Sequence, residues 1–451
     1  MKFIGLFIFF TGLLLVALGL LLFKPIDKRH YKEQDFYSRQ LQAIEQQAWT
    51  LSQNTCQAKA GWAKVPIVPA EPIAMAGYGI SRGAFERVHD SLYVYAIAWQ
   101  CNKQWFAIVS ADLLIFPPSV ATWLQKHLLP LTGILFENAL LTATHTHSGI
   151  GGWAGNLAGK LMAGGYRHEV VRMICQAVIA ALQQAQRSAS HLSYVAFDMV
   201  NLPGLMSNRL SKKRPPPIDG YLRCLQFIRR DSARAMVVAY QAHAICVHPR
   251  LLELSRDYPG YLIDSLIQSR KVEFALFASG MVASHVPNYN WGLDSYELAR
   301  DLGTRLAVHA IDLVKSTGEP LYKSGAWQIP LYLGDPQLRI TDHTVLRPEV
   351  FNLVFGKQPL YLSVMRLNNL LILGLPCDIS GEFASELMAK AANKKLHLLI
   401  TSFNGGYVGY ITPDEYYHYY APETREMNWT GPHKGAYFVE IISRVIECQT
   451  P

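Results

Sequence analysis

The residues best suited to chemistry lie in the segment Ala143-Thr144-His145-Thr146-His147-Ser148-Gly149, which follows the apolar run 139–141. If this segment continues a strand, alternation places His145 and His147 on the same face. Two imidazoles on one face, before a glycine-rich turn, suit a metal site: one ligates the ion, and the other hydrogen-bonds whatever the ion binds. The alternative is a pair of histidines that cap the strand end and bond to backbone.

Residues 144–149 resemble the Thr-His-Thr-His-Ser-Gly-Pro-Gly-Gly signature of the neutral/alkaline ceramidases, zinc-dependent hydrolases that cleave the amide of N-acyl sphingosine. Five further pieces resemble that family in the family's order, between about residues 70 and 440. The resemblance implies that His145 ligates zinc. It also implies that His147 acts beside the metal, on the nucleophile or on the leaving amine.

A second histidine ligand is implied at the end of a strand-like run. Residues 237–242 are followed by His243, which resembles the family's second zinc histidine. Downstream, residues 255–261 resemble the family's Ser-Asp-Asn-x-Gly-Tyr in looser form, which favours His243 over His248. The alternative is an ordinary structural histidine.

The carboxylate ligand implied by the resemblance is Asp378, at the end of Leu373-Gly374-Leu375-Pro376-Cys377-Asp378. This segment resembles the family's Gly-x-Pro-x-Glu with aspartate in place of glutamate. Aspartate can ligate zinc at the same distance, but its side chain is one methylene shorter. Glu382 is the fallback ligand, although a carboxylate in the first turn of a helix is also favoured by the helix N-terminus.

Two tyrosines and an arginine complete the implied site. Gly409-Tyr410-Ile411-Thr412-Pro413 resembles the segment with the family's zinc-binding tyrosine, so Tyr410 takes that role and Tyr420 the nearby transition-state role. Asn208-Arg209 resembles the family's Asn-Arg, whose arginine holds substrate near the metal. A guanidinium donates in a fixed fork and suits that task. The alternatives are aromatic packing for the tyrosines and a surface position for Arg209.

One motif departs from the family. Its Gly-Asp-Val-Ser-Pro-Asn corresponds to residues 283–288, where Val286 stands at the serine position. Ser284 lies beside His285, and a serine paired with histidine can be a nucleophile. Adjacent residues on a strand point apart, however, so we do not expect that pair to form. The departure puts the identity of the substrate in question more than metal binding.

Composition excludes several classes of protein. Half of the 451 residues are hydrophobic and 17% are charged, which is typical of a globular protein with a large core. The net charge of +8 could favour anionic lipid, but no basic stripe interleaved with aromatics indicates nucleic acid. The seven cysteines form no Cys-x-x-Cys and leave the redox compartment open.

The N-terminal segment predicts a membrane anchor. Residues 3–23 carry no charge and, as a helix, would span about 30 Å, which is the thickness of a hydrocarbon core. The run is long for a signal peptide, so an uncleaved transmembrane helix within residues 1–26 is predicted. Lysines after the run place the body in the cytoplasm by the positive-inside rule. The family resemblance argues for the periplasmic or extracellular side, which we predict.

Alternating and helical patterns together predict an α/β (α+β) fold with a central sheet system flanked by helices. The expected domains are the anchor at 1–26, a stalk or packing segment at 27–65, and one hydrolase domain at 66–451. The C-terminal β-domain of larger family members is not expected. The expected strands are 92–99, 105–116, 139–144, 192–197, 222–229, 235–244 and 272–278, with a hairpin formed by 360–366 and 370–375. The expected helices are 119–131, 168–187, 258–270, 296–315 and 381–394.

The resemblance therefore predicts a membrane-anchored zinc amidohydrolase that cleaves ceramide, or a similar lipid amide, into a sphingoid base and a fatty acid. His145, His243, Asp378 and Tyr410 would hold Zn²⁺, and His147, Arg209 and Tyr420 would be catalytic. An amidase for another N-acyl amine is the near alternative. A non-catalytic lipid- or metal-binding membrane protein on the same scaffold is the other. No obligate protein partner is expected.

Overall fold

A computed structural model describes residues 2–53, 58–288 and 294–450 of the chain. Its mixed α/β character agrees with the predicted fold class. The helices are α1 (Lys2–Leu22), α2 (Asp35–Glu45), α3 (Pro118–Thr132), α4 (Leu157–Ala163), α5 (His168–Arg187), α6 (Asp257–Gln268), α7 (Ser295–Asp312), α8 (Pro348–Phe355), α9 (Ala384–Asn393) and α10 (Lys434–Glu447).

The larger of two central sheets has eight strands in the order β15-β13-β12-β10-β3-β6-β7-β8. Most neighbours are antiparallel, but β13 with β15 and β7 with β8 run parallel. The strands are β3 (Lys59–Pro66), β6 (Tyr93–Cys101), β7 (Gln104–Ala111), β8 (Ala139–Ala143), β10 (Ser190–Asn201), β12 (Tyr221–Arg229), β13 (Arg234–Tyr240) and β15 (Phe274–Ser279).

The second sheet has five strands in the order β2-β17-β19-β20-β22. Its central hairpin joins β19 to β20 through Asn368 and Asn369, as predicted, and Asn368 takes a positive φ of 47° in that turn. The strands are β2 (Ser52–Gln53), β17 (Lys323–Pro330), β19 (Tyr361–Leu367), β20 (Leu370–Leu375) and β22 (His397–Ser402).

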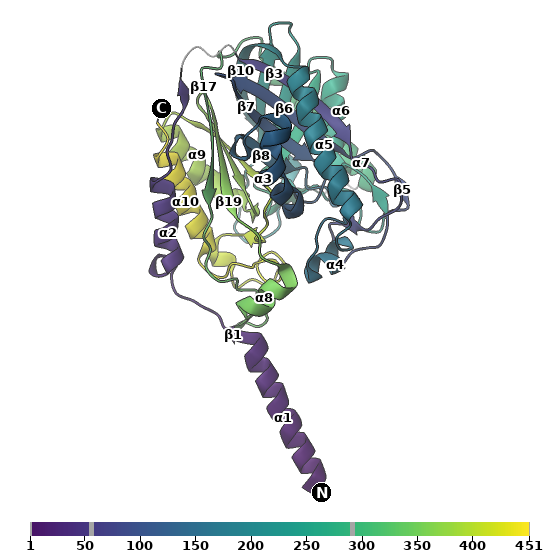
Figure 1. Ribbon diagram of the computed structural model, residues 1–451, viewed down its shortest axis with the longest axis vertical. Helices are drawn as coiled ribbons and strands as arrows, with labels where there is room; N and C mark the ends of the chain where they lie inside the picture. The colour runs from purple at the N-terminus through teal and green to yellow at the C-terminus, as the bar shows by residue number, and fades with distance from the viewer. Residues whose placement is uncertain (1, 54–57, 289–293, 451) are drawn as a thin grey trace.

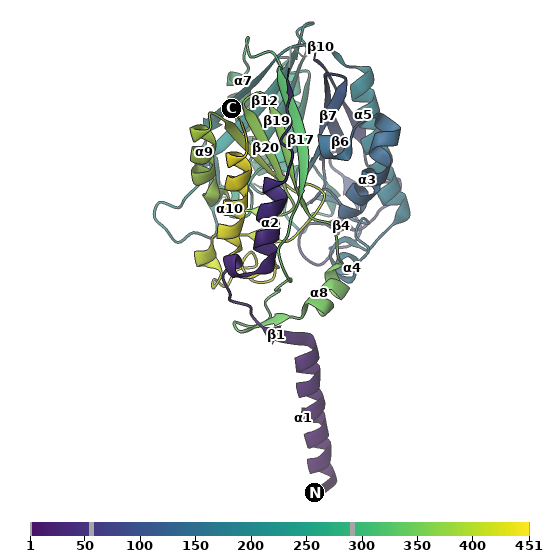
Figure 2. The ribbon, with the colours of Figure 1, turned by 60° about the vertical axis from the view of Figure 1, so that its left-hand side comes forward.

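The two sheets pack face to face between outer layers of helices (Figures 1 and 2). Side chains along β6 point alternately to the two faces of the larger sheet. Ile97 and Trp99 face the second sheet and share a core with Met365. Ala96 and Ala98 face the other core, under α3 and α5. A third core lies between the second sheet and the helices α2, α9 and α10. Because both sheets are covered on both faces, their strands are apolar at nearly every position.

Short strand pairs connect the ends of these layers. They are β1 (Phe23–Pro25) with β18 (Thr344–Leu346), β4 (Met75–Ala76) with β9 (Gly149–Ile150), β5 (Arg87–Val88) with β14 (Glu253–Leu254), β11 (Met206–Asn208) with β16 (His285–Pro287), and β21 (Asp378–Ile379) with β23 (Tyr410–Ile411).

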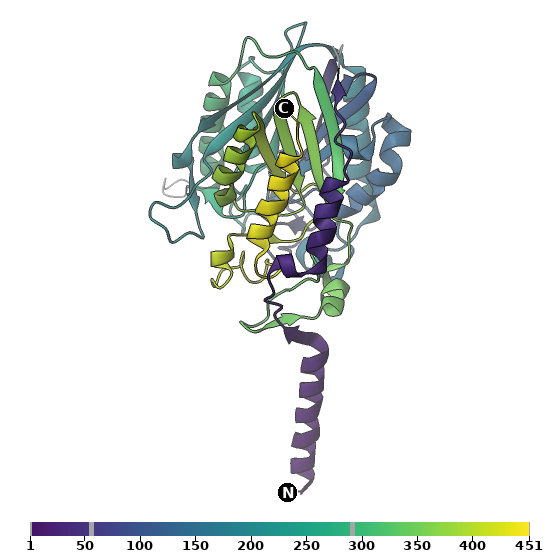
Figure 3. The ribbon, with the colours of Figure 1, turned by 90° about the vertical axis from the view of Figure 1, so that its left-hand side faces the viewer.

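The segment between the first helix and the sheets is packed on the body. Figure 3 shows α2 alongside α10, and buried Phe36 and Ile44 of α2 belong to the core beneath these helices. Lys434, the first residue of α10, places its ammonium 3.9 Å from the centre of the Phe36 ring. β3 lies almost entirely within the segment 27–65 that was predicted to be a stalk or packing segment, yet it belongs to the larger sheet and pairs along its whole length with β6.

Helix α1 projects from one end of the molecule in all three views of the ribbon (Figures 1–3). In the described part of the chain, no helix satisfies the combined length and hydropathy expected of a membrane-crossing segment. The predicted transmembrane helix therefore has no support from the structure.

Candidate metal and substrate site

The predicted ligands lie where several strands end. His145 and His147 follow β8, His243 follows β13, Asp378 follows β20, and Tyr410 begins β23. The short parallel pair β21–β23 sets Asp378 directly opposite Tyr410. Four segments that are far apart in the sequence thus meet at the carboxyl ends of β8, β13 and β20 and at the pair β21–β23.

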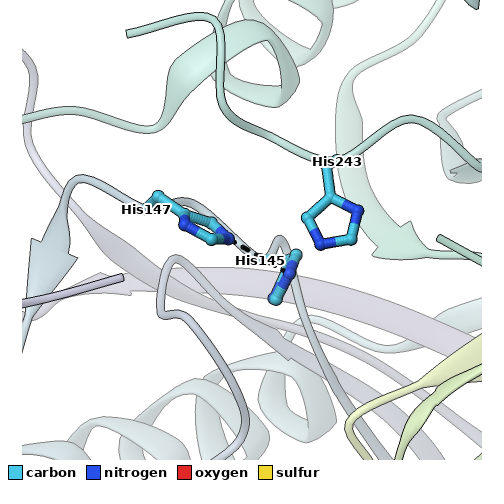
Figure 4. Close-up of side chains that lie close together, drawn as sticks. All are labelled: His145, His147 and His243. Carbon is cyan, nitrogen blue, oxygen red and sulfur yellow. Dashed lines mark hydrogen bonds between the residues drawn. The ribbon is translucent and has the colours of Figure 1, made fainter. Parts of the chain in front are cut away.

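Three imidazoles form the centre of the site (Figure 4). One nitrogen from each of His145, His147 and His243 lies within 4.8 Å of the other two, and the Nε2 atoms of His145 and His147 are 3.2 Å apart. The two residues are not on a strand, because β8 ends at Ala143 and His145 has a φ of +60°. The two rings do lie together, but the expected reason, alternation along a strand, was wrong. A left-handed turn at His145 directs both rings to the same place.

Two further predicted ligands approach the same point. Asp378 Oδ1 lies 3.6 Å from His145 Nε2 and 3.5 Å from His243 Nε2. The Tyr410 hydroxyl lies 3.0 Å from His243 Nε2. Two ligands about 2.0–2.1 Å from a tetrahedral zinc ion are separated by roughly 3.3 Å, so these spacings suit a shared ion.

The histidines have the protonation that a metal site requires. The Nδ1 atoms of His145 and His243 lie 2.6 Å from the Leu114 carbonyl and 2.9 Å from the Val282 carbonyl. Because a carbonyl only accepts, each Nδ1 carries the hydrogen and each Nε2 keeps a free lone pair. Burial lowers the pKa of His145 to about 3 and that of His243 well below its usual range, so both rings are neutral.

An unsatisfied oxygen also indicates a missing cation. Asp378 is fully buried, and its Oδ1 has no hydrogen-bond partner among the residues that the structure describes. Burial raises the pKa of this carboxyl group to about 7, against the opposing effects of Tyr407 and Arg209. A buried oxygen facing two imidazole lone pairs fits a metal ligand, because a cation would satisfy all three.

Tyr407 is a site residue that the motifs did not single out. Its hydroxyl donates a 2.6 Å hydrogen bond to Asp378 Oδ2, the oxygen that faces away from the histidines. The aspartate is thus held with only Oδ1 directed at the cluster. The signal in the sequence was slight: a tyrosine three positions before Tyr410, in the glycine-rich run 404–409.

Arg209 lies beside Tyr410. Its guanidinium is 3.5 Å from the Tyr410 hydroxyl, bonds the Ala283 carbonyl at 3.0 Å and pairs with Glu423 at 2.9 Å. Burial alone would lower the pKa of Arg209, but Tyr410 and Glu423 raise it above the usual value. Glu423 is a second residue that the motifs missed.

Tyr420 is not brought to this cluster. Its side chain is 77% exposed, its hydroxyl donates to Asp342 Oδ2 at 2.6 Å, and the Arg425 guanidinium stacks on its ring. Within the described residues, the contacts of Tyr420 are those of an exposed tyrosine on the surface.

Glu382 also lies apart from the histidines. Its carboxylate accepts hydrogen bonds from Asn208 and Tyr416, each 2.9 Å long. Burial raises the pKa of Glu382, and these two donors oppose the rise. Its observed partners are therefore different from those of Asp378, which leaves Asp378 as the carboxylate at the cluster.

Ser284 and His285 do contact each other, contrary to expectation, with 3.0 Å between Ser284 Oγ and His285 Nδ1. His285 Nε2 accepts the backbone N–H of Asp219, so its hydrogen must lie on Nδ1. Ser284 Oγ therefore accepts from His285, and it also shares a hydrogen bond with Ser380 Oγ, 2.7 Å away. A histidine that already donates to the serine cannot take the serine's proton, so this pair is not an activated nucleophile.

A pocket of about 730 Å³ opens onto the cluster, with His145, His147, Tyr407 and Tyr410 in its wall. The rest of its lining is mainly apolar and comes from the loop before α4, from α4, from α8 and from the segment that precedes α10. These apolar residues include Trp153, Ala158, Met162, Phe355, Met427 and Trp429. A cavity with an apolar body and a polar end suits a molecule with a long apolar part and one reactive polar group.

Comparison with solved structures first defines the class of fold. The chain superposes on a ceramidase described as complexed with C2 with a TM-score of 0.77, at 16% identity, over 87% of this chain and 75% of that one. It superposes on the neutral ceramidase of Pseudomonas aeruginosa with a TM-score of 0.76, at 17% identity, over 88% of this chain and 76% of that one. The fold is that of these ceramidases.

Sequence comparison then matches part of the chain to the same family. Residues 61–212 match the model of the neutral/alkaline non-lysosomal ceramidase N-terminal domain, which confirms the resemblance drawn from the motifs. The chain is also 27% identical, over 209 residues, to the neutral ceramidase of Mycobacterium tuberculosis (strain ATCC 25618 / H37Rv). That match covers 43% of this chain and 33% of the length of the relative.

Proposed function

We propose that this protein is a zinc-dependent amidohydrolase that cleaves the N-acyl amide of a lipid resembling ceramide. The observation that carries the proposal is the convergence of two imidazole lone pairs, the unsatisfied Asp378 Oδ1 and the Tyr410 hydroxyl at the polar end of an apolar pocket. His145, His243, Asp378 and Tyr410 would hold the ion. Zinc bound there would supply Lewis acidity, which polarises the amide carbonyl and acidifies water.

His147 has the position for proton transfer. Its ring borders the pocket and the cluster, and burial lowers its pKa well below the usual range, so the ring is neutral. We assign it to hold the proton taken from attacking water and to pass it to the leaving amine. The competing assignment is a third histidine ligand, since His147 also lies within reach of a shared ion.

Arg209 would stabilise the oxygen that becomes negative as the amide carbonyl is attacked. The guanidinium cannot lose its proton, and Glu423 and the Ala283 carbonyl fix its orientation. This arrangement is preformed, so no reorganisation is required when charge develops.

We further propose that α1 associates the protein with a membrane and that the body lies outside the cytoplasm. The support for association is the exposure of large apolar side chains on α1, with Phe3 90%, Phe7 73% and Leu21 66% exposed. The support for the compartment is that Cys101 is disulfide-bonded, because disulfides persist mainly in oxidising compartments.

The test is metal analysis together with a hydrolysis assay on the purified protein. We expect about one zinc per chain and release of fatty acid from ceramide, both lost in His145→Ala. In His147→Ala we expect zinc to remain and turnover to fall by about 10²–10⁴-fold, as for loss of a general base. Loss of zinc in His147→Ala would make that residue a ligand. Zinc without hydrolysis of any N-acyl amide would instead favour a binding protein on this scaffold, and turnover of another N-acyl amine would redefine the substrate.

A further inference from the structure

The mouth of the pocket is bordered by exposed apolar side chains that nothing in the described structure covers. Leu157 and Leu161 of α4, Leu353 of α8 and Ile80 are 50%, 55%, 78% and 75% exposed; we call these four residues the apolar rim. Ile80 belongs to the same edge, because its neighbour Gly79 lines the pocket and the Ser81 N–H bonds the Leu161 carbonyl. Large apolar side chains gathered around an opening mark a contact surface more often than isolated ones do.

The two sides of the mouth are held together. Asn156 accepts the backbone N–H of Gly159 at the start of α4, and its amide donates to the Phe355 carbonyl at the end of α8. Asn156, Phe355 and Gly356 all line the pocket. The rim is therefore a fixed border on both sides of the opening.

Helix α1 is joined by strand pairing and hydrogen bonds to the segment before α8, which forms one side of this mouth. β1, which follows α1, pairs with β18, which precedes α8. Arg347, the residue before α8, bonds the carbonyls of Leu20 and Leu22 at the end of α1, at 2.8 and 2.9 Å. Figures 1 and 2 show the consequence: α1 leaves the body at the end where α8 and α4 lie.

The charges at the mouth do not oppose contact with lipid. The exposed residues Lys160 of α4 and Lys357 after α8 lie beside the opening, and Lys357 lines it together with exposed Glu426. One excess cation on an otherwise apolar border is compatible with phosphate headgroups. Apolar contact, not charge, is then the main interaction.

We propose that the apolar rim rests on a lipid bilayer, so that the pocket opens directly against the leaflet into which α1 inserts. A lipid amide would enter between α4 and α8 with its amide leading towards the cluster and its apolar part still in the bilayer, without crossing water. The inference rests on the proposed function for the identity of the entering lipid, but the docking surface itself does not.

Hydrogen exchange tests the docking surface without any assay of activity. The full-length protein is compared in buffer and with phosphatidylcholine vesicles, and amides of α4 and α8 should exchange more slowly with vesicles. The variant Leu157→Glu/Leu353→Glu should lose this protection while still floating with vesicles through α1. Matched controls are Leu129→Glu and Val308→Glu, which change leucine and valine that are 50% and 53% exposed and do not line the pocket.

The outcomes are separable. Unchanged exchange in α4 and α8 on vesicles would overturn the docking surface. Protection that depends on protein concentration, without vesicles, would overturn it in favour of a second copy of the chain. Protection with vesicles but no hydrolysis of any amide would support the docking surface while contradicting the proposed function.

A kinetic comparison tests the route of entry. For ceramide presented in vesicles, the rim variant should lose at least about tenfold in kcat/KM, because two leucines no longer reach apolar lipid. For a short-chain amide dissolved in buffer, it should match the unmodified protein. Equal losses on both substrates would show that the rim contributes to the pocket itself and would contradict entry from the bilayer.

Discussion

At the scale of single residues, the arrangement around Asp378 explains how aspartate can serve at a position where the related motif has glutamate. The strand pair β21–β23 sets the aspartate backbone opposite Tyr410, and Asp378 Oδ1 lies 3.6 and 3.5 Å from the Nε2 atoms of His145 and His243. Tyr407 then occupies Oδ2, which leaves one oxygen for a metal.

Substituting the two candidate carboxylates tests this assignment. Asp378→Ala should lose zinc and turnover, whereas Glu382→Ala should keep both, because Glu382 bonds Asn208 and Tyr416 and not the histidines. Asp378→Glu should be poorly tolerated despite matching the family, since a longer acid must fit a site that is already fully buried. Zinc content and kcat of the three variants decide the matter. If Glu382→Ala is the inactive variant, the carboxylate has been assigned one helical turn too early.

Tyr407 should act as a positioning residue. Removing its hydroxyl in Tyr407→Phe frees Asp378 Oδ2 and should weaken zinc affinity by about 10–100-fold, the usual effect of losing a partner of a metal ligand. Competition with a zinc chelator measures this. Tyr417→Phe is the matched control, because the buried Tyr417 hydroxyl has no hydrogen-bond partner in the described structure. Equal affinity in both variants would contradict the role of Tyr407.

At the scale of elements, patterns within one segment could be predicted from sequence, and contacts between segments could not. The amphipathic helix α5 and the hairpin at Asn368-Asn369 were predicted within a few residues of their bounds, because periodicity and turn chemistry are local. The left-handed turn at His145 was missed because the fold, not the preference of histidine, imposes it.

The same distinction applies to the site. The motifs named His243 and Tyr410, which lie beside each other in the structure, whereas Tyr407 and Glu423 became visible only once loops remote in sequence were in contact. For Tyr420 the motif indicated a site residue that the structure does not bring to the cluster. The assignment rested on a spacing that differs by about two residues from the family motif, and the Tyr420 hydroxyl bonds exposed Asp342.

The connection between α1 and the body predicts where the chain can be cut. Deletion of residues 1–22 should leave the melting temperature and zinc content unchanged and abolish flotation with vesicles. Deletion of residues 1–28 should lower stability by on the order of 2 kcal/mol, because it also removes β1 and the bond from the Asp27 N–H to Gln337. Urea unfolding of both proteins measures the difference. Equal stability would show that β1 contributes nothing to the fold.

At the scale of the whole molecule, a buried lysine lies between the N-terminal segment and the C-terminal helix. Lys434 is 4% exposed and lies against Phe36, and burial lowers its pKa to about 7 while Asp27 and Asp414 oppose the change. The folded pKa is below the unfolded value. The unfolded chain therefore binds the proton more tightly, and stability falls as the pH drops from about 10 towards 7.

Lys434→Met should remove this dependence. At pH 6 the variant should be more stable by on the order of 1–3 kcal/mol, and the difference should vanish near pH 10. Urea unfolding at several pH values measures it. The control Lys390→Met changes a lysine that pairs with Glu386 on the surface, and its profile should follow that of the unmodified protein. A Lys434→Met profile parallel to the unmodified one would contradict a depressed pKa.

The hydrogen bonds that join α1 to the body have a consequence for which lipids the protein can use. Leu22, the β1 residues, Ile26 and Asp27 all bond to residues 337–347, so no free linker separates the helix from the pocket. A body on a flexible tether could tumble and sample both its own membrane and vesicles nearby. Under the proposed docking, this protein is confined to two-dimensional encounters within one leaflet. Its turnover would then follow the surface density of substrate in that leaflet, and lipid in the opposite leaflet would become available only after flip-flop.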